Sequence, residues 1–445
     1  MLTKGVVFIS IPIFSRILNP TEFGVVSVFV SLFMITSILI QLNVAGSIRQ
    51  YILKSNKHTG SYIFNQVLFF LLFFLILVLP ITILFKDNIS SYFEIDIKIY
   101  YLLITGSFAN VFISFYEYYL LGVNKSKEFS IFSFVRAVFE IVVSIIFVLI
   151  LFTNKDIGRI SGMVLTYSLF ALYSFYRIIK LIKNYTFDPK YIKYALAFGT
   201  PLIIHQLSSV VLAQADRVII SKILDFEYVG LYSMAYSLGM VMMIVVTAFN
   251  SAWLPKFYNL MKTNDYKTIH KNLITNLKLL IILSILASII LNYLLPIIIS
   301  KEYADSFSLV SIIIMSAVFM FIYLMYANFS FYQNKTWYIS IGTILAAIVN
   351  IGLNYLLIPI YGYKVAALTT VISYLSMAIL HYLISSKILH SNVVKVGLVA
   401  KFILPYTLWV IVYYYFSIGY FNYSFLFELF TVLLLIWILY KSNKK

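Results

Sequence analysis

Two groups of polar residues interrupt long apolar stretches, and they could carry charge-dependent chemistry. In the first group, Arg136 and Glu140 stand one helical turn apart, and Ser133 and Ser144 extend the same face. A charge at the bilayer centre costs about 2.5–3.5 kcal/mol on insertion scales, so each needs a partner or a cavity. The spacing allows Arg136 and Glu140 to pair within one helix. Alternatively, Arg136 snorkels to the interface, whereas Glu140 lies nearer the midplane.

The second group holds His205, Ser209 and Asp216, whose spacing also returns to one helical face. Arg217 is adjacent, and Lys222 follows about one turn later. One interpretation is the wall of a hydrophilic cavity in which His205 or Asp216 titrates. The other is a structural ion pair between Asp216 and Arg217 at the outer interface. The sequence leaves both open.

An internal repeat relates two parts of the chain at a constant offset of 206 residues. Residues 15–35 match residues 221–241 without a gap, and eight of these 21 positions are identical. The matched positions include Gly24 with Gly230. Because the offset contains an even number of predicted helices, both copies should have the same orientation. The sequence therefore predicts a parallel repeat of two bundles about an axis along the membrane normal.

The repeat pairs two cations, Arg16 and Lys222, which should lie at equivalent depths in the two halves. Two cations facing each other across a pseudo-axis would bind an anion, and phosphate fits best because Arg grips it bidentately. Arg49 would add a cation on the inner side, or it is an ordinary loop charge. The predicted substrate-binding cations are Arg16, Arg49, Arg136, Arg217 and Lys222.

Transmembrane helices must position these groups. Hydrophobic residues make up 62% of the 445 residues and charged residues only 11%, against about 25% charged in soluble domains. Continuous apolar stretches favour helices over barrel strands, and a span needs about 20 residues. The 14 candidate spans are 2–18, 23–46, 61–85, 99–122, 129–152, 159–182, 197–220, 229–253, 273–299, 306–332, 338–360, 363–386, 400–419 and 423–440.

The distribution of basic residues predicts the orientation. With the N-terminus in the cytoplasm, 24 of the 33 Lys and Arg residues fall on the cytoplasmic side, as the positive-inside rule requires. Both termini are then cytoplasmic. This excess of basic residues in the cytoplasmic loops explains the net charge of +17, so no nucleic-acid partner is predicted. Cysteine is absent, and neither a P-loop nor an H-E-x-x-H motif occurs, so we predict no cofactor and no metal site.

The spans and the repeat together predict the domain organisation. We expect an all-α integral membrane protein of about 14 transmembrane helices, arranged as two pseudo-symmetric six-helix bundles plus two C-terminal helices. The predicted parts are an N-terminal lobe (1–183), a basic cytoplasmic linker (184–196), a C-terminal lobe (197–390) and two additional helices (391–445).

The segment from Pro12 to Gly24, with the sequence PIFSRILNPTEFG, resembles the opening signature of a bacterial membrane protein family. This family contains the polysaccharide-biosynthesis proteins, the O-antigen and capsule flippases of the multidrug/oligosaccharidyl-lipid/polysaccharide exporter superfamily. Further similar motifs are DRVII at 216–220, VGLYS at 229–233 and IPIYG at 358–362, followed by alanines at 366–367. The chain departs from the family where Val365 replaces a usual glycine, and its first helix begins later than usual.

The resemblance implies two six-helix lobes around a central cavity. It further implies transport of undecaprenyl-diphosphate-linked oligosaccharide from the cytoplasmic to the outer leaflet of the bacterial inner membrane, with Arg16 and Arg49 holding the diphosphate. The implied partners are this lipid-linked oligosaccharide and the lipid bilayer, and a polysaccharide polymerase and chain-length proteins are further candidates. Because no nucleotide site is visible, we expect alternating access coupled to an ion or to voltage. Candidate titrating groups are Glu140, His205 and Asp216.

Two other functions remain to be weighed. A multidrug exporter of the same superfamily should present acidic groups to cationic drugs, and the cations at the repeat positions argue against it. A membrane glycan polymerase or glycosyltransferase should carry a large outer loop. The longest predicted outer loop, from Lys86 to Lys98, has only about a dozen residues, which is too few to house such a site.

Overall fold

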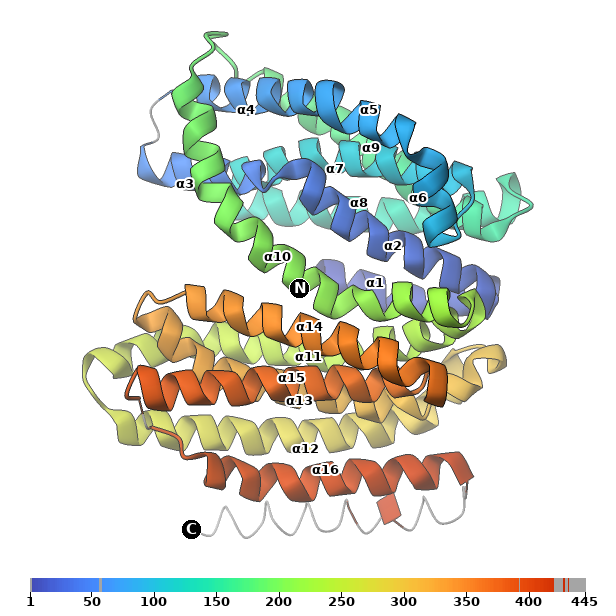
Figure 1. The fold of residues 1–445 in the computed structure, drawn as a ribbon, viewed down its shortest axis with the longest axis vertical. Coiled ribbons are helices and arrows are strands. Elements are labelled where there is room, and N and C mark those ends of the chain that lie inside the picture. Colours follow the sequence, from blue (N-terminus) through green and yellow to red (C-terminus); the bar gives the residue numbers. More distant parts are fainter. Residues whose placement is uncertain (1, 56–57, 392, 420–426, 429–430, 432–445) are drawn as a thin grey trace. The chain divides into compact units, whose positions relative to one another are not determined.

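The computed structural model describes residues 2–55, 58–391, 393–419, 427–428 and 431. Helices joined by short turns make up this part of the chain, and it contains no strand (Figure 1). The chain forms two compact units, Met1–Gly230 and Leu231–Lys445. The all-α fold is confirmed. The predicted lobe and linker boundaries remain a prediction.

The predicted spans correspond closely to the helices. In the described residues, 12 helices are long and apolar enough to cross a membrane. The first predicted span is the shorter helix α1 (Leu2–Ile17), of 16 residues. The predicted span 423–440 falls almost wholly outside the described residues. The 12 long helices and α1 together make 13 of the 14 predicted spans in the described part of the chain. The remaining predicted span is 423–440.

The first unit contains ten α-helices and the start of an eleventh. After α1 come α2 (Pro20–Gln41), α3 (Val44–Lys54), α4 (Thr59–Phe73), the π-helix η1 (Phe74–Val78), α5 (Leu79–Leu84), α6 (Lys86–Phe93), α7 (Ile97–Gly122), α8 (Ser126–Ile146), the π-helix η2 (Phe147–Leu151), α9 (Lys155–Ile179), α10 (Pro189–Ile223) and α11 (Phe226–Lys262), which continues into the second unit.

The second unit continues with α12 to α16. They are α12 (Tyr266–Ile298), the 3-10 helix η3 (Lys301–Ser306), α13 (Leu309–Tyr332), α14 (Trp337–Tyr361), α15 (Val365–Leu383), the π-helix η4 (Ile384–Ile388) and α16 (Val396–Gly419). Helix α13 is the central element, because 89% of its most apolar window is buried. Helices α12, α15 and α16 pack against it.

The second predicted span is broken in the structure. Leu42 and Asn43 both have left-handed backbone angles, with φ of 47° and 51°, so α2 ends at Gln41 and α3 begins at Val44. Asparagine tolerates this conformation, whereas leucine adopts it at a cost of about 1–2 kcal/mol. Gln41 and Asn43 interrupt the apolar pattern at this point, and the predicted span passed over them. Its consequence is that Arg49 lies on a separate short helix.

The repeat has a local structural basis in helix capping. The Asn19 side chain accepts the backbone N–H of Glu22, and the Glu22 carboxylate accepts the N–H of Asn19, which forms a capping box at the start of α2. At the equivalent position, Asp225 accepts the N–H of Glu227 at 2.7 Å, at the start of α11. Both copies of the repeat therefore begin a long helix with a side-chain cap.

The two repeat-related glycines pack against each other's helix. A Cβ on Gly24 would overlap the carbonyl oxygen of Phe226, and a Cβ on Gly230 would overlap the carbonyl oxygen of Pro20. Pro20 and Phe226 are themselves related by the offset of 206 residues. The first turns of α2 and α11 thus meet in a symmetric contact, in which each helix contributes the repeat-related counterpart of the residues that the other contributes. Only glycine allows two helix backbones to approach this closely.

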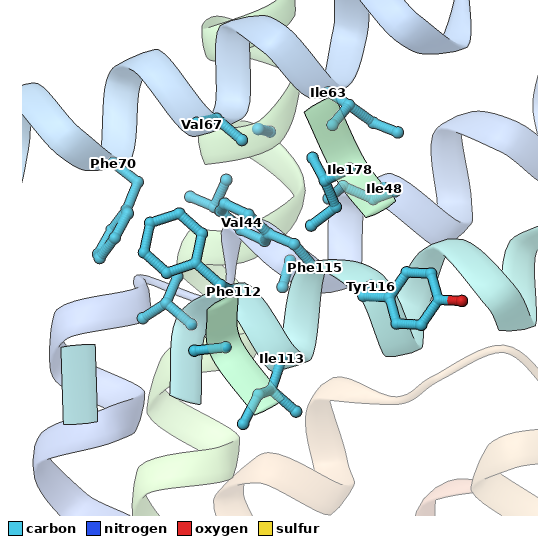
Figure 2. Packing of buried hydrophobic residues seen from close by; sticks show 14 of the residues in the cluster. Val44, Ile48, Ile63, Val67, Phe70, Phe112, Ile113, Phe115, Tyr116 and Ile178 are labelled. Carbon is cyan, nitrogen blue, oxygen red and sulfur yellow. The ribbon is translucent and has the colours of Figure 1, made fainter. Parts of the chain in front are cut away.

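A hydrophobic core joins α3, α4, α7 and α9 in the first unit. Phe70 of α4 meets Phe112 of α7 edge to face, with ring centroids 5.5 Å apart, and Ile48 of α3 is fully buried. Figure 2 shows these side chains converging with those of Val67 and Ile178. Because lipid tails are themselves apolar, such close packing, and not exclusion of water, holds membrane helices together. This core fixes α7 and α9, which carry two charged site residues described below.

We predict that Gly24→Ala destabilises the protein by about 1–3 kcal/mol, because the added methyl forces the first turns of α2 and α11 apart. Gly352→Ala in α14 is the matched control, because a Cβ there meets nothing within 4 Å and alanine favours a helix. Thermal unfolding of the purified variants measures both effects. Equal midpoints for the two variants would contradict the close contact.

Candidate functional site: an ion-pair ladder between helices

The charged stripe of α8 forms ion pairs with both neighbouring helices. Arg136 Nη2 lies 3.0 Å from Glu117 Oε1 of α7, and the Ser133 hydroxyl donates to the same oxygen at 3.1 Å. These ion-paired side chains are only 18% and 20% exposed. The Glu117 carboxylate thus accepts hydrogen bonds from an arginine and a hydroxyl, and these protein donors replace the water molecules that would otherwise solvate it.

The second rung of the ladder joins α8 to α9. Arg159 Nη2 lies 3.0 Å from Glu140 Oε1, with side-chain exposures of 12% and 18%, and Arg159 also donates to the Ser144 hydroxyl. The Arg159 guanidinium stacks 4.3 Å from the ring centroid of Phe14 in α1. Four helices, α1, α7, α8 and α9, therefore meet at these two pairs. We call Glu117–Arg136 and Glu140–Arg159 the ion-pair ladder.

An aromatic side chain lies among the four charges of the ladder. The Arg136 guanidinium is 5.2 Å from the ring centroid of Tyr167 in α9. Tyr167 in turn meets Phe33 of α2 edge to face at 5.1 Å. Cations interact favourably with an aromatic face, most strongly where water is scarce. Tyr167 thus connects the ladder to α2.

The expected pairing of Arg136 with Glu140 within one helix is wrong. Each residue finds its partner on a neighbouring helix, because Arg before Glu at i, i+4 is the less favourable order on a helix and the adjacent helices offer better placed groups. Arg159, which is not among the predicted site residues, lies inside a candidate membrane span. The signal for Glu117 was present in sequence: Ser107, Asn110, Ser114 and Glu117 share one face of α7.

Lys222 does not stand as an isolated cation. Its Nζ lies 3.6 Å from Glu94 Oε1 and 4.4 Å from the ring centroid of Tyr92, near the end of α6. An acidic neighbour therefore offsets the charge of Lys222. The anion site expected between Arg16 and Lys222 stays a prediction. The segment from Lys86 to Lys98, predicted to be an outer loop, instead consists largely of the short helix α6.

Some polar residues of α10 contact other helices of the first unit. Gln214 accepts the hydroxyl of Ser31 in α2 at 3.1 Å. Asp216 is fully buried, Arg217 is 6% exposed and His205 is half-buried. Arg217 Nη1 donates to the carbonyl oxygen of Ala213 one turn earlier, at 2.8 Å.

The predicted diphosphate ligands Arg16 and Arg49 are both exposed. Arg16 lies in the last turn of α1, next to Ile17, whose carbonyl oxygen accepts a hydrogen bond from Lys155 Nζ at 2.9 Å. Arg49 lies in the middle of α3. Of the five predicted cations, these two have the most accessible side chains. Arg136 and Lys222, in contrast, pair with Glu117 and Glu94.

The second unit contains its own buried polar cluster. Asn354 Nδ2 donates to Asn350 Oδ1 at 3.3 Å, and the Thr369 hydroxyl of α15 donates to Asn354. Tyr232 of α11 lies within hydrogen-bonding distance of Thr370, at 3.4 Å. Asn354 therefore bonds across to α15, whereas its bond to Asn350 lies within α14. These bonds tie α11, α14 and α15 together inside the apolar unit.

Comparison with known proteins decides the family. The sequence profile of the polysaccharide biosynthesis proteins matches residues 1–261, which is more than half of the chain. The chain belongs to this family. A protein of the Lsg locus of Haemophilus influenzae is 25% identical over 366 residues, covering 79% of this chain and 86% of that protein. An uncharacterized membrane protein of the same organism is 23% identical over 359 residues, with 78% and 85% covered.

Two solved structures show the same fold. A multidrug resistance transporter of the MATE family and MOP superfamily, in an inward-facing conformation, has a TM-score of 0.70 at 16% identity, with 87% of this chain and 94% of that chain covered. The lipid II flippase MurJ, in an inward closed conformation, has a TM-score of 0.69 at 19% identity, with 99% and 100% covered. These likenesses show the fold, and the expected multi-pass membrane architecture is confirmed.

We predict that Glu140→Gln lowers the free energy of unfolding by about 1–3 kcal/mol. Breaking a buried ion pair typically costs 3–5 kcal/mol, and the residual exposure of this pair reduces the effect. The charge-reversed double variant Glu140→Arg with Arg159→Glu should recover most of the loss, as measured by a double-mutant cycle of thermal unfolding.

The matched control is Glu128→Gln, which breaks the exposed pair of Lys125 and Glu128 at 2.8 Å. Its side chains are about half exposed, so its loss should be below about 0.5 kcal/mol. If Glu140→Gln and Glu128→Gln had the same small effect, the ladder would have no structural role.

Proposed function

We propose that this protein moves an undecaprenyl-diphosphate-linked oligosaccharide from the cytoplasmic to the outer leaflet of the bacterial inner membrane by alternating access. The observation that carries the proposal is the match to the polysaccharide biosynthesis family together with a fold that covers, end to end, a structure described as a lipid II flippase. Transporters with internal repeats alternate by rocking one repeat against the other around a fixed site. The 206-residue repeat supplies the matched halves that this mechanism needs.

In this proposal Arg16 and Arg49 hold the diphosphate. A diphosphate needs donors that it can reach, and both side chains are exposed. Arg136 and Lys222 serve less well, because a substrate phosphate would have to displace Glu117 or Glu94. Arg217 is buried and donates within its own helix, so it is the least suited of the five predicted cations.

Coupling to an ion or to voltage is the second part of the proposal. Asp216 and His205 share α10, and Glu140 belongs to the ladder. Loss of the charge on Glu140 would weaken its pair with Arg159 and so change how α8 holds α9. Movement of a charge across the membrane potential supplies about 2.3 kcal/mol per 100 mV. A polysaccharide polymerase and chain-length proteins are the partners we propose downstream of the transport step.

We predict that Arg16→Ala and Arg49→Ala each reduce surface polysaccharide at least tenfold in a strain that depends on this chain, at unchanged protein level. The loss of one charge-assisted contact to phosphate, about 1.5–3 kcal/mol, gives an effect of this size. Transport of a fluorescent undecaprenyl-diphosphate oligosaccharide in proteoliposomes measures the step directly. Lys54→Ala, an exposed cation at the end of α3, is the control for Arg49. Wild-type transport by both arginine variants would refute the cation site.

Export of cationic drugs is the second candidate function, favoured by the TM-score of 0.70 to a multidrug transporter. A deletion strain that becomes sensitive to cationic drugs, while its surface glycan is unchanged, would support it over the flippase. A membrane polymerase has less support, because the outer segment expected to house its site contains an eight-residue helix, α6.

A further inference from the structure

A groove between α8 and α9, closed at its base by α7, lies apart from the ion-pair ladder. Its volume is about 590 Å³, within the range of pockets that hold small molecules. Its aromatic lining comes from Tyr116, Phe132, Phe139, Phe170 and Tyr173. Phe132 contacts both Tyr116 and Phe170, with ring centroids 5.3 and 5.4 Å apart, so the floor of the groove is a continuous aromatic surface.

The two ends of the groove differ in polarity. One end holds Glu128 and Arg177, whereas the other end holds Phe139, Leu169 and Phe170. Glu128 and Phe139 are eleven residues apart on α8, which is about 16 Å along a helix. This length is about half of the 30 Å hydrocarbon core. The groove therefore matches one leaflet in depth, with a polar end at the surface and an apolar end near the midplane.

The groove opens outward and not into a protein core. Val135 is 48% exposed and Tyr173 is 44% exposed, although both line it. Large apolar side chains on the same faces, such as Ile131 and Leu172, are still more exposed. Helix faces of this composition contact the acyl chains of the bilayer. The occupant must therefore enter from the lipid.

Arg177 is held in place at the polar end. Its guanidinium lies 5.5 Å from the ring centroid of Tyr116 and 5.6 Å from that of Tyr173, and Nη1 donates to the Tyr173 hydroxyl at 2.6 Å. Unlike Arg136 and Arg159, it takes part in none of the ion pairs found among the described residues. An arginine has five N–H donors and binds phosphate in a bidentate manner.

The surrounding charge favours an anion. Glu128 is engaged by Lys125 at 2.8 Å, and Lys127 and Lys180 add positive charge near the same helix ends. Basic pockets between transmembrane helices on the cytoplasmic side bind anionic head groups. By the distribution of basic residues, this end of α8 and α9 is the cytoplasmic one.

We propose that the groove binds one anionic glycerophospholipid of the cytoplasmic leaflet, with the phosphate on Arg177 and an acyl chain along the aromatic floor. The site is separate from the proposed transport pathway and does not rest on it. A lipid bound here would fill the groove between α8 and α9 and so stabilise the helices that carry the ladder.

The test is native mass spectrometry of the full-length protein in nanodiscs of matched phosphatidylglycerol and phosphatidylethanolamine. We expect the wild type to retain phosphatidylglycerol, and Arg177→Ala to retain it about tenfold less, with partial recovery in Arg177→Lys. The control Lys183→Ala removes a nearby exposed cation and should retain lipid like the wild type. Phosphatidylglycerol should also raise the unfolding temperature of the wild type and not that of Arg177→Ala.

A second variant keeps the proposal open to refutation if Arg177→Ala fails to fold. Val135→Trp fills the groove from its exposed side and should abolish retention of phosphatidylglycerol. Equal retention of the two phospholipids, unchanged retention in Val135→Trp, or retention of a polyprenyl lipid in place of a phospholipid would each overturn the proposal. Because the assay does not measure transport, its result is independent of the flippase proposal.

Discussion

The constraint on which the structure depends is that a charge inside a bilayer must find its partner within the protein. Arg136 and Glu140, placed on one face of α8, meet this requirement through Glu117 and Arg159 on the two neighbouring helices. A pair within α8 would have left its neighbours uncoupled. Pairs between helices satisfy the same electrostatic need and, in addition, fix α7, α8 and α9 relative to one another.

The same constraint separates structural cations from accessible ones. Four of the basic side chains in or near the spans of the first unit are already engaged: Arg136 and Arg159 in the ladder, Lys222 with Glu94, and Arg217 with a backbone carbonyl. Exposure then distinguishes Arg16 and Arg49 as the side chains that a diphosphate could reach. Arg177 differs again, because aromatic rings support it and it opens toward lipid.

The repeat has a physical meaning beyond sequence similarity. Asn19 and Asp225 cap equivalent helices, and Gly24 and Gly230 allow those helices to meet backbone to backbone. Each residue type is explained by its own contact: a cap needs a side-chain acceptor, and a close approach needs the absence of a Cβ. This chain, a member of the polysaccharide biosynthesis family, uses these contacts in both copies of its repeat.

Composition and hydropathy by themselves determined the fold class, because a chain with 62% hydrophobic and 11% charged residues can fold only in lipid and only as helices. The spans, the repeat and the motif of residues 12–24 also predicted the superfamily. Tertiary structure decided the partners of each charge. Periodicity reports which face a residue occupies on its own helix, whereas the neighbouring helix supplies Glu117, Arg159 or Glu94, and no local pattern encodes that neighbour. The break at Leu42 and Asn43 escaped prediction because polar residues such as Gln41 and Asn43 also occur inside continuous membrane helices, so their presence does not by itself end a helix.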